Sequence, residues 1–208
     1  MLTAENFDIV TPLPNGTHTA RAMRPDKGTG RTYEDLVQVQ VEDGKVQLQD
    51  TPLCRIAVFD RHTGRAGRMI GLVSGDDFLK KGAVACTYAH DHHNLLVAGK
   101  EAEDCAVAAN QVIANQGGYC VVENGKILAW LPLEVGGIVT EAPLSETADR
   151  AGEVAKAMHH LGYEFDNPVM SFSVLGLSVS MFLRITDRGY VAAKEGKLLP
   201  LFPEEEKR

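Results

Sequence analysis

The sequence lacks the features that would mark a membrane, secreted or nucleic-acid-binding protein. None of its 208 residues lies in an apolar stretch approaching the ~20 residues that cross a bilayer. The N-terminus has no basic region followed by an apolar run, so we expect no signal peptide here. The formal net charge is −7, and the basic residues are scattered and form no patch for phosphates. We expect a cytoplasmic protein that binds neither nucleic acid nor membrane.

Cysteine is scarce, and its spacing argues against two kinds of site. The four cysteines contain no C-x-x-C pair, which disfavours a structural zinc site or a thioredoxin-like motif. Cys86, Cys105 and Cys120 lie among apolar neighbours, which predicts reduced thiols in the core. At 44% hydrophobic and 24% charged residues, the chain can build a core without a covalent or metal cross-link.

Short strands dominate the pattern. Residues 1–30 carry few periodic signals and hold Pro12, Pro14, Pro25 and several glycines; Asn15-Gly16 and residues 27–30 predict turns. Alternation at residues 37–41 and 46–49, around Glu42-Asp-Gly, predicts a β-hairpin, and Asn124-Gly125 predicts a second one. Further predicted strands cover residues 55–60, 69–73, 82–87, 94–98, 119–123, 126–131, 182–186 and 190–191. A loop is predicted at residues 63–67, and the chain ends in an acidic tail.

Two segments have helical periodicity. Residues 101–116 carry acidic side chains in the first turn and end at Gly117-Gly118. Residues 145–160 follow, with Ser145 as the expected N-cap and Gly162 as the stop. A long apolar run, partly alternating, covers residues 169–179. We predict an α+β fold of mixed or antiparallel sheets of short strands, with two main helices packed on the sheet faces.

The strongest chemical feature is Tyr-Ala-His-Asp-His-His-Asn at residues 88–94, which holds three of the seven histidines. Imidazole and carboxylate together form a common ligand set for a transition metal. Consecutive residues of an extended segment point to opposite faces, so a loop or bulge is needed to bring all of these side chains together. The alternative is a structural turn in which His90, Asp91 and Asn94 are hydrogen-bonded and His92 and His93 are partly exposed.

Residues 55–192 resemble the C-terminal domain of the bacterial adenine deaminase family. The matching stretches are Lys81 to Gly99, Glu103-Asp104, Val122 to Lys126, Leu131 to Ile138, Asn167 to Ser173 and Thr186 to Gly189. Arg61-His62 resembles the element that begins that domain. We expect residues 1–54 to be an N-terminal β-hairpin segment packed on the core, and residues 55–208 to be the adenine-deaminase C-terminal-like domain.

The resemblance implies chemistry that this chain contains only in part. In that family, adenine is deaminated in an amidohydrolase barrel that binds two divalent metals, and a barrel alone takes ~250 residues. His90-Asp-His92 belongs to the C-terminal signature and is not the metal pair of the barrel. His92 departs from the family, which has a small polar residue such as Ser at this position. Gly75-Asp-Asp-Phe and Leu177-Ser178 are further departures.

A working site at the cluster would use residues of several types. His90, Asp91, His92 and His93 are the candidate ligands of a divalent manganese, zinc or iron ion, which would supply hydroxide for hydrolysis. His90, Asp91, His93 and Glu123 are the candidate catalytic residues, with Asp76, Asp77 or Glu141 as other bases. Arg61, His62 and Asn94 are the candidate substrate-binding residues. Arg61 could instead pair with Asp60 or Asp77, and His159-His160 suit a helix C-terminus.

Three functions remain open on the sequence alone. The first is a metal-dependent hydrolase of the adenine deaminase type, acting on a C–N bond of a purine-like or other nitrogen heterocycle. The second is a non-catalytic accessory subunit that completes, or oligomerises with, a separate amidohydrolase barrel. The third is a purine-binding module. We lean towards the enzyme, and expect a small-molecule substrate of purine type, an amidohydrolase barrel partner and a homo-oligomer.

Overall fold

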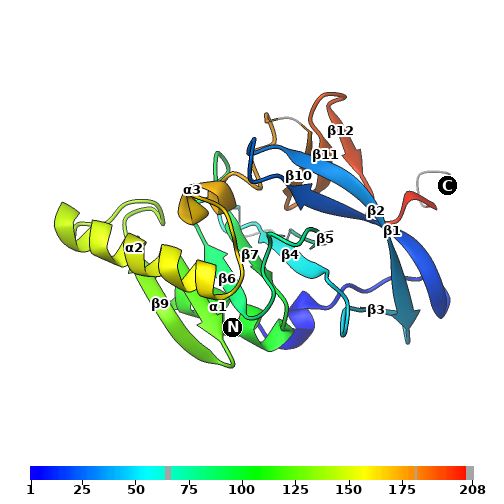
Figure 1. The fold of residues 1–208 in the computed structure, drawn as a ribbon, viewed down its shortest axis with the longest axis horizontal. Helices are drawn as coiled ribbons and strands as arrows, with labels where there is room; N and C mark the ends of the chain where they lie inside the picture. Colours follow the sequence, from blue (N-terminus) through cyan, green and yellow to red (C-terminus); the bar gives the residue numbers. More distant parts are fainter. Residues whose placement is uncertain (64–66, 181, 205–208) are drawn as a thin grey trace.

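A nine-stranded mixed sheet and a separate three-stranded sheet organise the chain in the computed structural model (Figure 1). The structure describes residues 1–63, 67–180 and 182–204. In the large sheet the strand order is β3-β2-β1-β5-β4-β7-β6-β8-β9. Its strands are β1 (Gly16–Pro25), β2 (Thr32–Glu42), β3 (Lys45–Gln47), β4 (Cys54–Phe59), β5 (Arg68–Val73), β6 (Ala83–Cys86), β7 (Leu95–Gly99), β8 (Gly118–Glu123) and β9 (Lys126–Pro132). Among the strand pairs of the described residues, β1 and β5 alone run in parallel, and one isolated bridge, between Thr32 and Phe182, is also parallel.

The small sheet and the helices complete the α+β fold that the sequence predicts. The small sheet is antiparallel and consists of β10 (Leu183–Thr186), β11 (Gly189–Ala192) and β12 (Lys197–Leu199). The helices are η1 (Ala4–Phe7), α1 (Ala102–Ala114), α2 (Leu144–His160) and α3 (Pro168–Ser173). No helix in the described part of the chain is long and apolar enough to cross a membrane.

The central strands are buried on both faces, and their residues alternate between two cores. Val84 and Cys86 of β6 belong to the core beneath α2 and α3, whereas Ala83 and Ala85 belong to the core beneath α1 and η1. Strands β7 and β8 alternate in the same way. The period of two explains why these segments read as nearly continuous apolar runs. The two main helices therefore cover opposite faces of the sheet.

Both predicted hairpins form. Strands β2 and β3 join through Asp43 and Gly44, with φ of 49° and 74°, and β8 and β9 join through Asn124 and Gly125, with φ of 51° and 72°. Two consecutive positive φ angles match the twist of the flanking strands, and Asn-Gly and Asp-Gly adopt them at low cost. The predicted loop at residues 63–67 and the acidic tail include residues 64–66 and 205–208, which lie outside the described residues.

Several elements differ from the sequence expectations, among them β1, the start of α2 and α3. Residues 16–25, for which the sequence predicts no strand, make β1, whose pairing with β2 runs from Gly16↔Val41 to Pro25↔Thr32. The expectation that Ser145 caps the second helix is wrong, because α2 begins at Leu144 with Pro143 at the cap position. The apolar run after residue 168 starts as helix α3, since the side chain of Asn167 accepts a hydrogen bond from the Met170 amide and Pro168 occupies the first turn.

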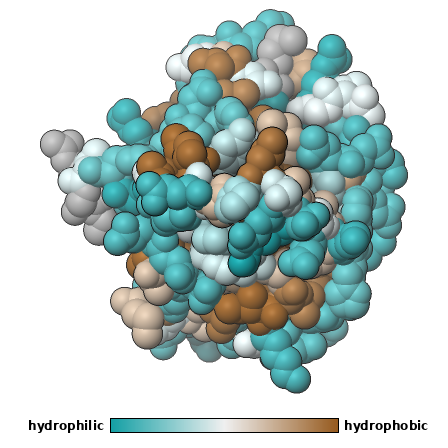
Figure 2. All heavy atoms as spheres, turned by 90° about the vertical axis from the view of Figure 1, so that its left-hand side faces the viewer, coloured by the Kyte–Doolittle hydropathy of each residue, from teal (hydrophilic) through white to brown (hydrophobic). Residues whose placement is uncertain are grey.

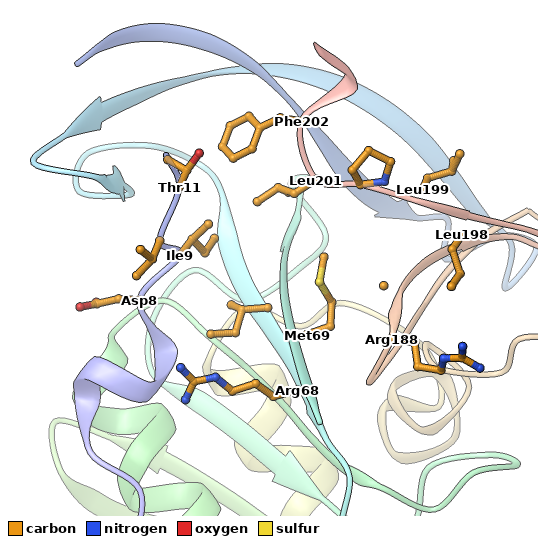
Figure 3. A pocket seen from close by; sticks show the side chains of 14 residues that line it. Asp8, Ile9, Thr11, Arg68, Met69, Arg188, Leu198, Leu199, Leu201 and Phe202 are labelled. Carbon is orange, nitrogen blue, oxygen red and sulfur yellow. The ribbon is translucent and has the colours of Figure 1, made fainter. Parts of the chain in front are cut away.

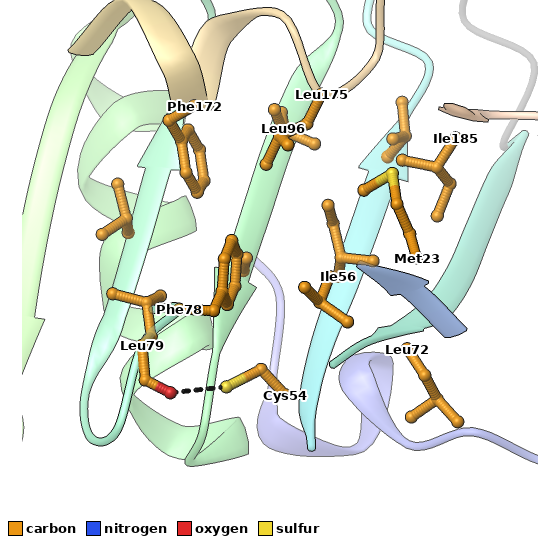
Figure 4. Packing of buried hydrophobic residues seen from close by; sticks show 14 of the residues in the cluster. Met23, Cys54, Ile56, Leu72, Phe78, Leu79, Leu96, Phe172, Leu175 and Ile185 are labelled. Carbon is orange, nitrogen blue, oxygen red and sulfur yellow. Dashed lines mark hydrogen bonds between the residues drawn. The ribbon is translucent and has the colours of Figure 1, made fainter. Parts of the chain in front are cut away.

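All four cysteines are free and buried, which confirms the prediction of core thiols. Figure 4 shows Cys54 donating to the carbonyl of Leu79 at 2.9 Å, beside Phe78 and Ile56. Burial raises the pKa of the Cys54, Cys86 and Cys120 thiols to about 12 and also raises the pKa of Cys105. All four side chains are therefore neutral packing groups at physiological pH.

A single hydroxyl joins the small sheet to the large one. Tyr190 of β11 is fully buried, and its hydroxyl accepts from the Leu72 amide at 2.6 Å and donates to the Leu72 carbonyl at 2.8 Å. Gly71 permits this approach, because a Cβ there would lie 2.4 Å from the Tyr190 oxygen. These bonds lie on the edge of β5 opposite β4, where β1 pairs in parallel through Leu72 and Val73.

We expect Tyr190→Phe to lower the free energy of unfolding by about 1–3 kcal/mol, because it leaves the buried Leu72 amide without its acceptor. Urea denaturation measures the change. Tyr33→Phe is the matched control, since Tyr33 stacks on Phe182 at 5.4 Å and its hydroxyl makes no recorded hydrogen bond within the described residues. Equal stability losses in the two variants would contradict this account.

Candidate functional site

The histidine cluster forms the loop between β6 and β7. Thr87 anchors its start: the Thr87 amide donates to Gly118 O at 3.1 Å, and the Thr87 hydroxyl accepts from Gly118 N at 2.9 Å. The same hydroxyl donates to Gly137 O at 2.7 Å, which connects this loop to the one between β9 and α2. Because β6 and β7 pair with Cys86 opposite Leu96, the loop is held at one end of the large sheet.

His90 is tied to α3. Its amide donates to Ser173 O at 2.9 Å, and its Nδ1 lies 3.1 Å from the Ser173 hydroxyl oxygen. That hydroxyl donates its own proton to Met170 O at 2.8 Å, so it accepts the Nδ1 proton of His90. The imidazole packs edge-on against Tyr88, with ring centroids 4.9 Å apart. This bonding uses Nδ1 as a donor and leaves only Nε2 with a lone pair.

His92 turns into the protein. Its Nδ1 accepts from the Asn94 amide at 2.9 Å, so the proton of the neutral ring is on Nε2. Nε2 is buried without a hydrogen-bond partner among the described residues, and it faces Gly176 so closely that a Cβ there would lie 2.1 Å away. Burial lowers the pKa of His92 to about 4, against the opposing pull of Asp187. His92 is therefore a neutral, packed side chain.

The other loop residues, His93, Asp91 and Asn94, differ from one another in burial and bonding. His93 has a left-handed backbone, with φ of 46°, and its ring centroid lies 5.6 Å from that of His90. Burial, followed by the charge of His90, lowers the pKa of His93. Asp91 is exposed. Asn94 is buried, and its amide nitrogen donates to Asp187 at 3.4 Å, which joins the loop to the turn between β10 and β11.

Arg61 and His62 hold the loop through its backbone carbonyls. Arg61 donates from Nε to His93 O at 2.5 Å and from Nη2 to Gly136 O at 2.7 Å. His62 Nε2 lies 2.9 Å from His92 O. Arg61 therefore pairs with neither Asp60 nor Asp77, the two structural partners considered from the sequence; Asp77 instead binds Lys27 at 3.0 Å. Burial lowers the pKa of Arg61.

The structure does not bring Glu123 to this loop. Gly118 lies level with Thr87, whereas Glu123 ends β8 five residues further on, roughly 15 Å away along the strand. There Glu123 binds Lys81 at 2.7 Å and His160 at 2.8 Å, and Lys81 is the main cause of the lowered pKa of Glu123. Glu141 lies with Glu134, whose carboxylate accepts from the Glu141 amide at 3.2 Å.

The donors of the loop do not fit a metal ion. Within the described residues, no three His, Cys, Asp or Glu side chains converge in a way that could hold one. His90 and His93 face each other, but His92 points away towards Gly176 and Asp91 towards solvent. A four-coordinate site needs donor atoms about 2 Å from a common centre, and this loop does not gather them.

Several residues that build the site come from elsewhere in the chain. Ser173 contacts His90 across 83 residues of sequence, and Gly176 lies against His92. Gly136 binds Arg61 through its carbonyl, and Gly137 leaves room for the Arg61 guanidinium, which a Cβ would approach to 2.7 Å. Beside the loop lies a cavity of about 420 Å³. Its lining comprises Tyr88, Tyr119, Leu131, Leu133, Ile138, Ala151, Ala155, Asn167, Val169 and Met170.

We expect His92 to make the protein less stable in acid. Its folded-state pKa of about 4 lies below the ordinary 6.5, so protons bind preferentially to the unfolded chain as pH falls. The stability that His92 contributes by staying neutral is fully present above pH 6.5 and is lost as the pH falls towards 4. Between pH 7 and pH 5 this lowers the free energy of unfolding by about 2 kcal/mol. Urea titrations at both pH values should show a smaller pH dependence for His92→Asn. The control is His18→Asn, and an unchanged pH dependence in His92→Asn would refute the assignment.

Arg61→Lys should loosen the loop, because lysine cannot reach His93 O and Gly136 O together in a planar fork. We expect about 1–3 kcal/mol lower stability, since both carbonyls lose a partner, and faster amide exchange at residues 90–94. Arg150→Lys is the control, as Arg150 is exposed on α2 and pairs with Glu146 at 2.9 Å. Unchanged exchange in Arg61→Lys would show that the loop holds itself in place.

Comparison with known proteins places these elements in a family. A family model for the adenine deaminase C-terminal domain matches residues 31–197. Adenine deaminase 2 of Shouchella clausii (strain KSM-K16) is 46% identical over 204 residues, which cover 98% of this chain and 35% of the relative. Adenine deaminases of Clostridium perfringens (strain 13 / Type A) and Moorella thermoacetica are 39% and 36% identical over 97% and 96% of the chain.

The match covers nearly all of this chain but only part of each relative. The chain spans about a third of the length of these relatives, with 35%, 35% and 34% of their residues covered. The loop of residues 88–94, its Arg61 anchor and the Gly136-Gly137 turn all lie inside the residues that match the family model. The chain belongs to the adenine deaminase C-terminal domain family.

Proposed function

We propose that this chain is a non-catalytic accessory domain of an adenine deaminase, which acts by docking on an amidohydrolase barrel. The first support is the extent of the match with the relatives. Proteins named adenine deaminase match almost the whole of this chain, yet the chain spans only about a third of their length. The barrel that the family resemblance implies needs ~250 residues, more than the 208 of this chain. In this proposal the purine substrate belongs to the barrel.

The hydrogen bonding and packing of the three imidazoles are the main support for the proposal. His90 donates a hydrogen bond from Nδ1 to the Ser173 hydroxyl. His92 is neutral and packs against Gly176. The buried Nδ1 of His93 has no hydrogen-bond partner among the described residues. In a hydrolase of this type, a divalent metal supplies hydroxide for attack on the amidine-like carbon. The loop offers no convergent ligand set for such an ion, and its candidate base Glu123 is bound to Lys81 at the other end of β8. Its bonding pattern is that of a rigid surface loop.

The face formed by α2 and β9 suits a protein partner. Figure 2 shows the face of α2 and β9, where apolar patches are separated by hydrophilic ones. The exposed apolar side chains of this region are Ile127, Leu128, Val135, Val139, Leu144 and Met170. Met170 also lines the cavity beside Tyr88. Mixed surfaces with apolar side chains next to a concavity are typical of non-obligate interfaces.

The proposal predicts that the chain alone releases no ammonia from adenine, with or without Mn²⁺, Zn²⁺ or Fe²⁺. It also predicts a complex with a barrel. The barrel probe is the part of Shouchella clausii adenine deaminase 2 that this chain does not match. Isothermal titration measures the complex, ammonia release measures whether this chain changes the activity of the barrel, and light scattering measures whether the chain also forms the expected homo-oligomer.

Surface variants make the test specific. Val139→Asp and Met170→Asp should each weaken the complex at least tenfold, because each buries a charge at the proposed interface. Val179→Asp is the control, since Val179 is exposed but belongs neither to α2, α3 and β9 nor to the turn that the bridge between Val135 and Val139 closes. Metal-dependent ammonia release by this chain alone, abolished in His90→Ala, would overturn the proposal in favour of the hydrolase. Absence of any complex with the barrel would also overturn it.

A further inference from the structure

Strand β5 has an open edge. Its pairing with β4 places Ala57 opposite Ile70 and Phe59 opposite Arg68. The Leu72 amide and carbonyl both bind the Tyr190 hydroxyl, so Leu72 points its backbone away from β4. Backbone direction alternates in an antiparallel pair, so Ile70 and Arg68 also point their amides and carbonyls away from β4. Strand β1 covers this edge only at Leu72 and Val73.

A second open edge lies on the segment before β1. Val46 N donates to Ile9 O, and Thr11 N donates to Gly44 O, each at 2.9 Å. These two bonds enclose a bridge between Val10 and Lys45, so the amide and carbonyl of Val10 point away from β3. No partner for them is recorded among the described residues. The side chain of Val10 is 72% exposed.

One cleft of about 450 Å³ is lined by both edges, residues 9–11 and residues 68–70 (Figure 3). Its remaining wall is mostly apolar and comes from the end of the chain, with Leu198, Leu199 and Leu201. In the close-up, Ile9 and Thr11 lie on one side of the cleft, Met69 lies beside β5, and the leucines close the top and far side. The sheet that runs β5-β1-β2-β3 and on to Val10 thus curls around an open seam.

Two guanidinium groups stand at this cleft. Arg68 and Arg188 both line it and are exposed, and neither has an ion pair recorded within the described residues. They lie on a chain whose formal net charge is −7. Asp8, the acidic residue of the lining, is neutralised by Lys45 at 2.7 Å. The cleft therefore combines strand edges, an apolar wall and uncompensated positive charge.

We infer that this cleft binds an extended segment of another polypeptide that carries a carboxylate. The segment adds as a short strand between Val10 and Ile70, with its backbone bonded to the two open edges and alternate side chains against the leucine wall. Acidic groups of the segment meet Arg68 on one side of the cleft or Arg188 on the other (Figure 3), and guanidinium groups form charge-assisted bonds with carboxylates. Strand addition gives affinity through the main chain, and the arginines select the charge. The inference does not depend on the proposed accessory function.

Phage-displayed linear peptides, selected on the whole chain and counter-selected on an Arg68→Gln/Arg188→Gln variant, supply the probe. We expect enriched peptides to carry Asp or Glu within a β-branched stretch. The selected peptide should bind the double variant at least tenfold more weakly, and N-methylation of alternate peptide amides should abolish binding. Val10→Pro should weaken binding as well, because it removes an amide that bonds to no described residue. Thermal melts confirm that each variant is folded.

Amide hydrogen exchange decides where the peptide lies. Bound peptide should slow exchange at Val10 and Ile70, while the amides around the 88–94 loop remain unchanged. The inference is overturned if no peptide is enriched over the double variant, or if enriched peptides bind without protecting Val10 and Ile70. Protection of the same two amides with rising protein concentration and no peptide would assign the seam to a second copy of this chain, and would also overturn it.

Discussion

Burial of the central strands on both faces is the constraint on which the rest of the structure depends. Strands β6 and β7 have fully buried residues at every position, so their amides and carbonyls have no water to bind and must pair across the ladder. A one-residue shift would exchange the two cores, since Val84 and Ala85 pack on opposite faces. The fixed register in turn sets where Thr87 leaves β6 and where Asn94 enters β7.

The local part of this architecture can be predicted from the sequence. Helix α1, the two hairpins and strands β4 to β9 follow from periodicity and turn residues, because the residues that determine each of these elements lie within it. Strand β1 could not be predicted, since His18 to Met23 read as irregular until β2 pairs with them over ten residues. The start of α2 also differs, because Pro143 with its fixed φ takes the place expected for Ser145.

The position of the candidate site could be predicted, but its bonding could not. Seven consecutive residues identify the loop, yet the state of each imidazole depends on partners distant in sequence: Ser173 for His90, Gly176 for His92 and the Arg61 anchor for the His93 carbonyl. Residue type indicates what a histidine can ligate. Whether it is free to do so depends on which groups the fold places within hydrogen-bonding distance. The same limit applies to Glu123, whose position on β8 separates it from the loop.

The four buried thiols have a practical consequence. Only the thiolate attacks an alkylating reagent, and burial both shields these sulfurs and raises their pKa values far above the ordinary value of a thiol. Cys105 and Cys120 lie in the core beneath α1, whereas Cys54 and Cys86 lie in the core beneath α2 and α3. The native chain thus carries two chemical reporters on each side of its sheet. The order in which they become reactive distinguishes loosening of one helical layer from opening of the whole sheet.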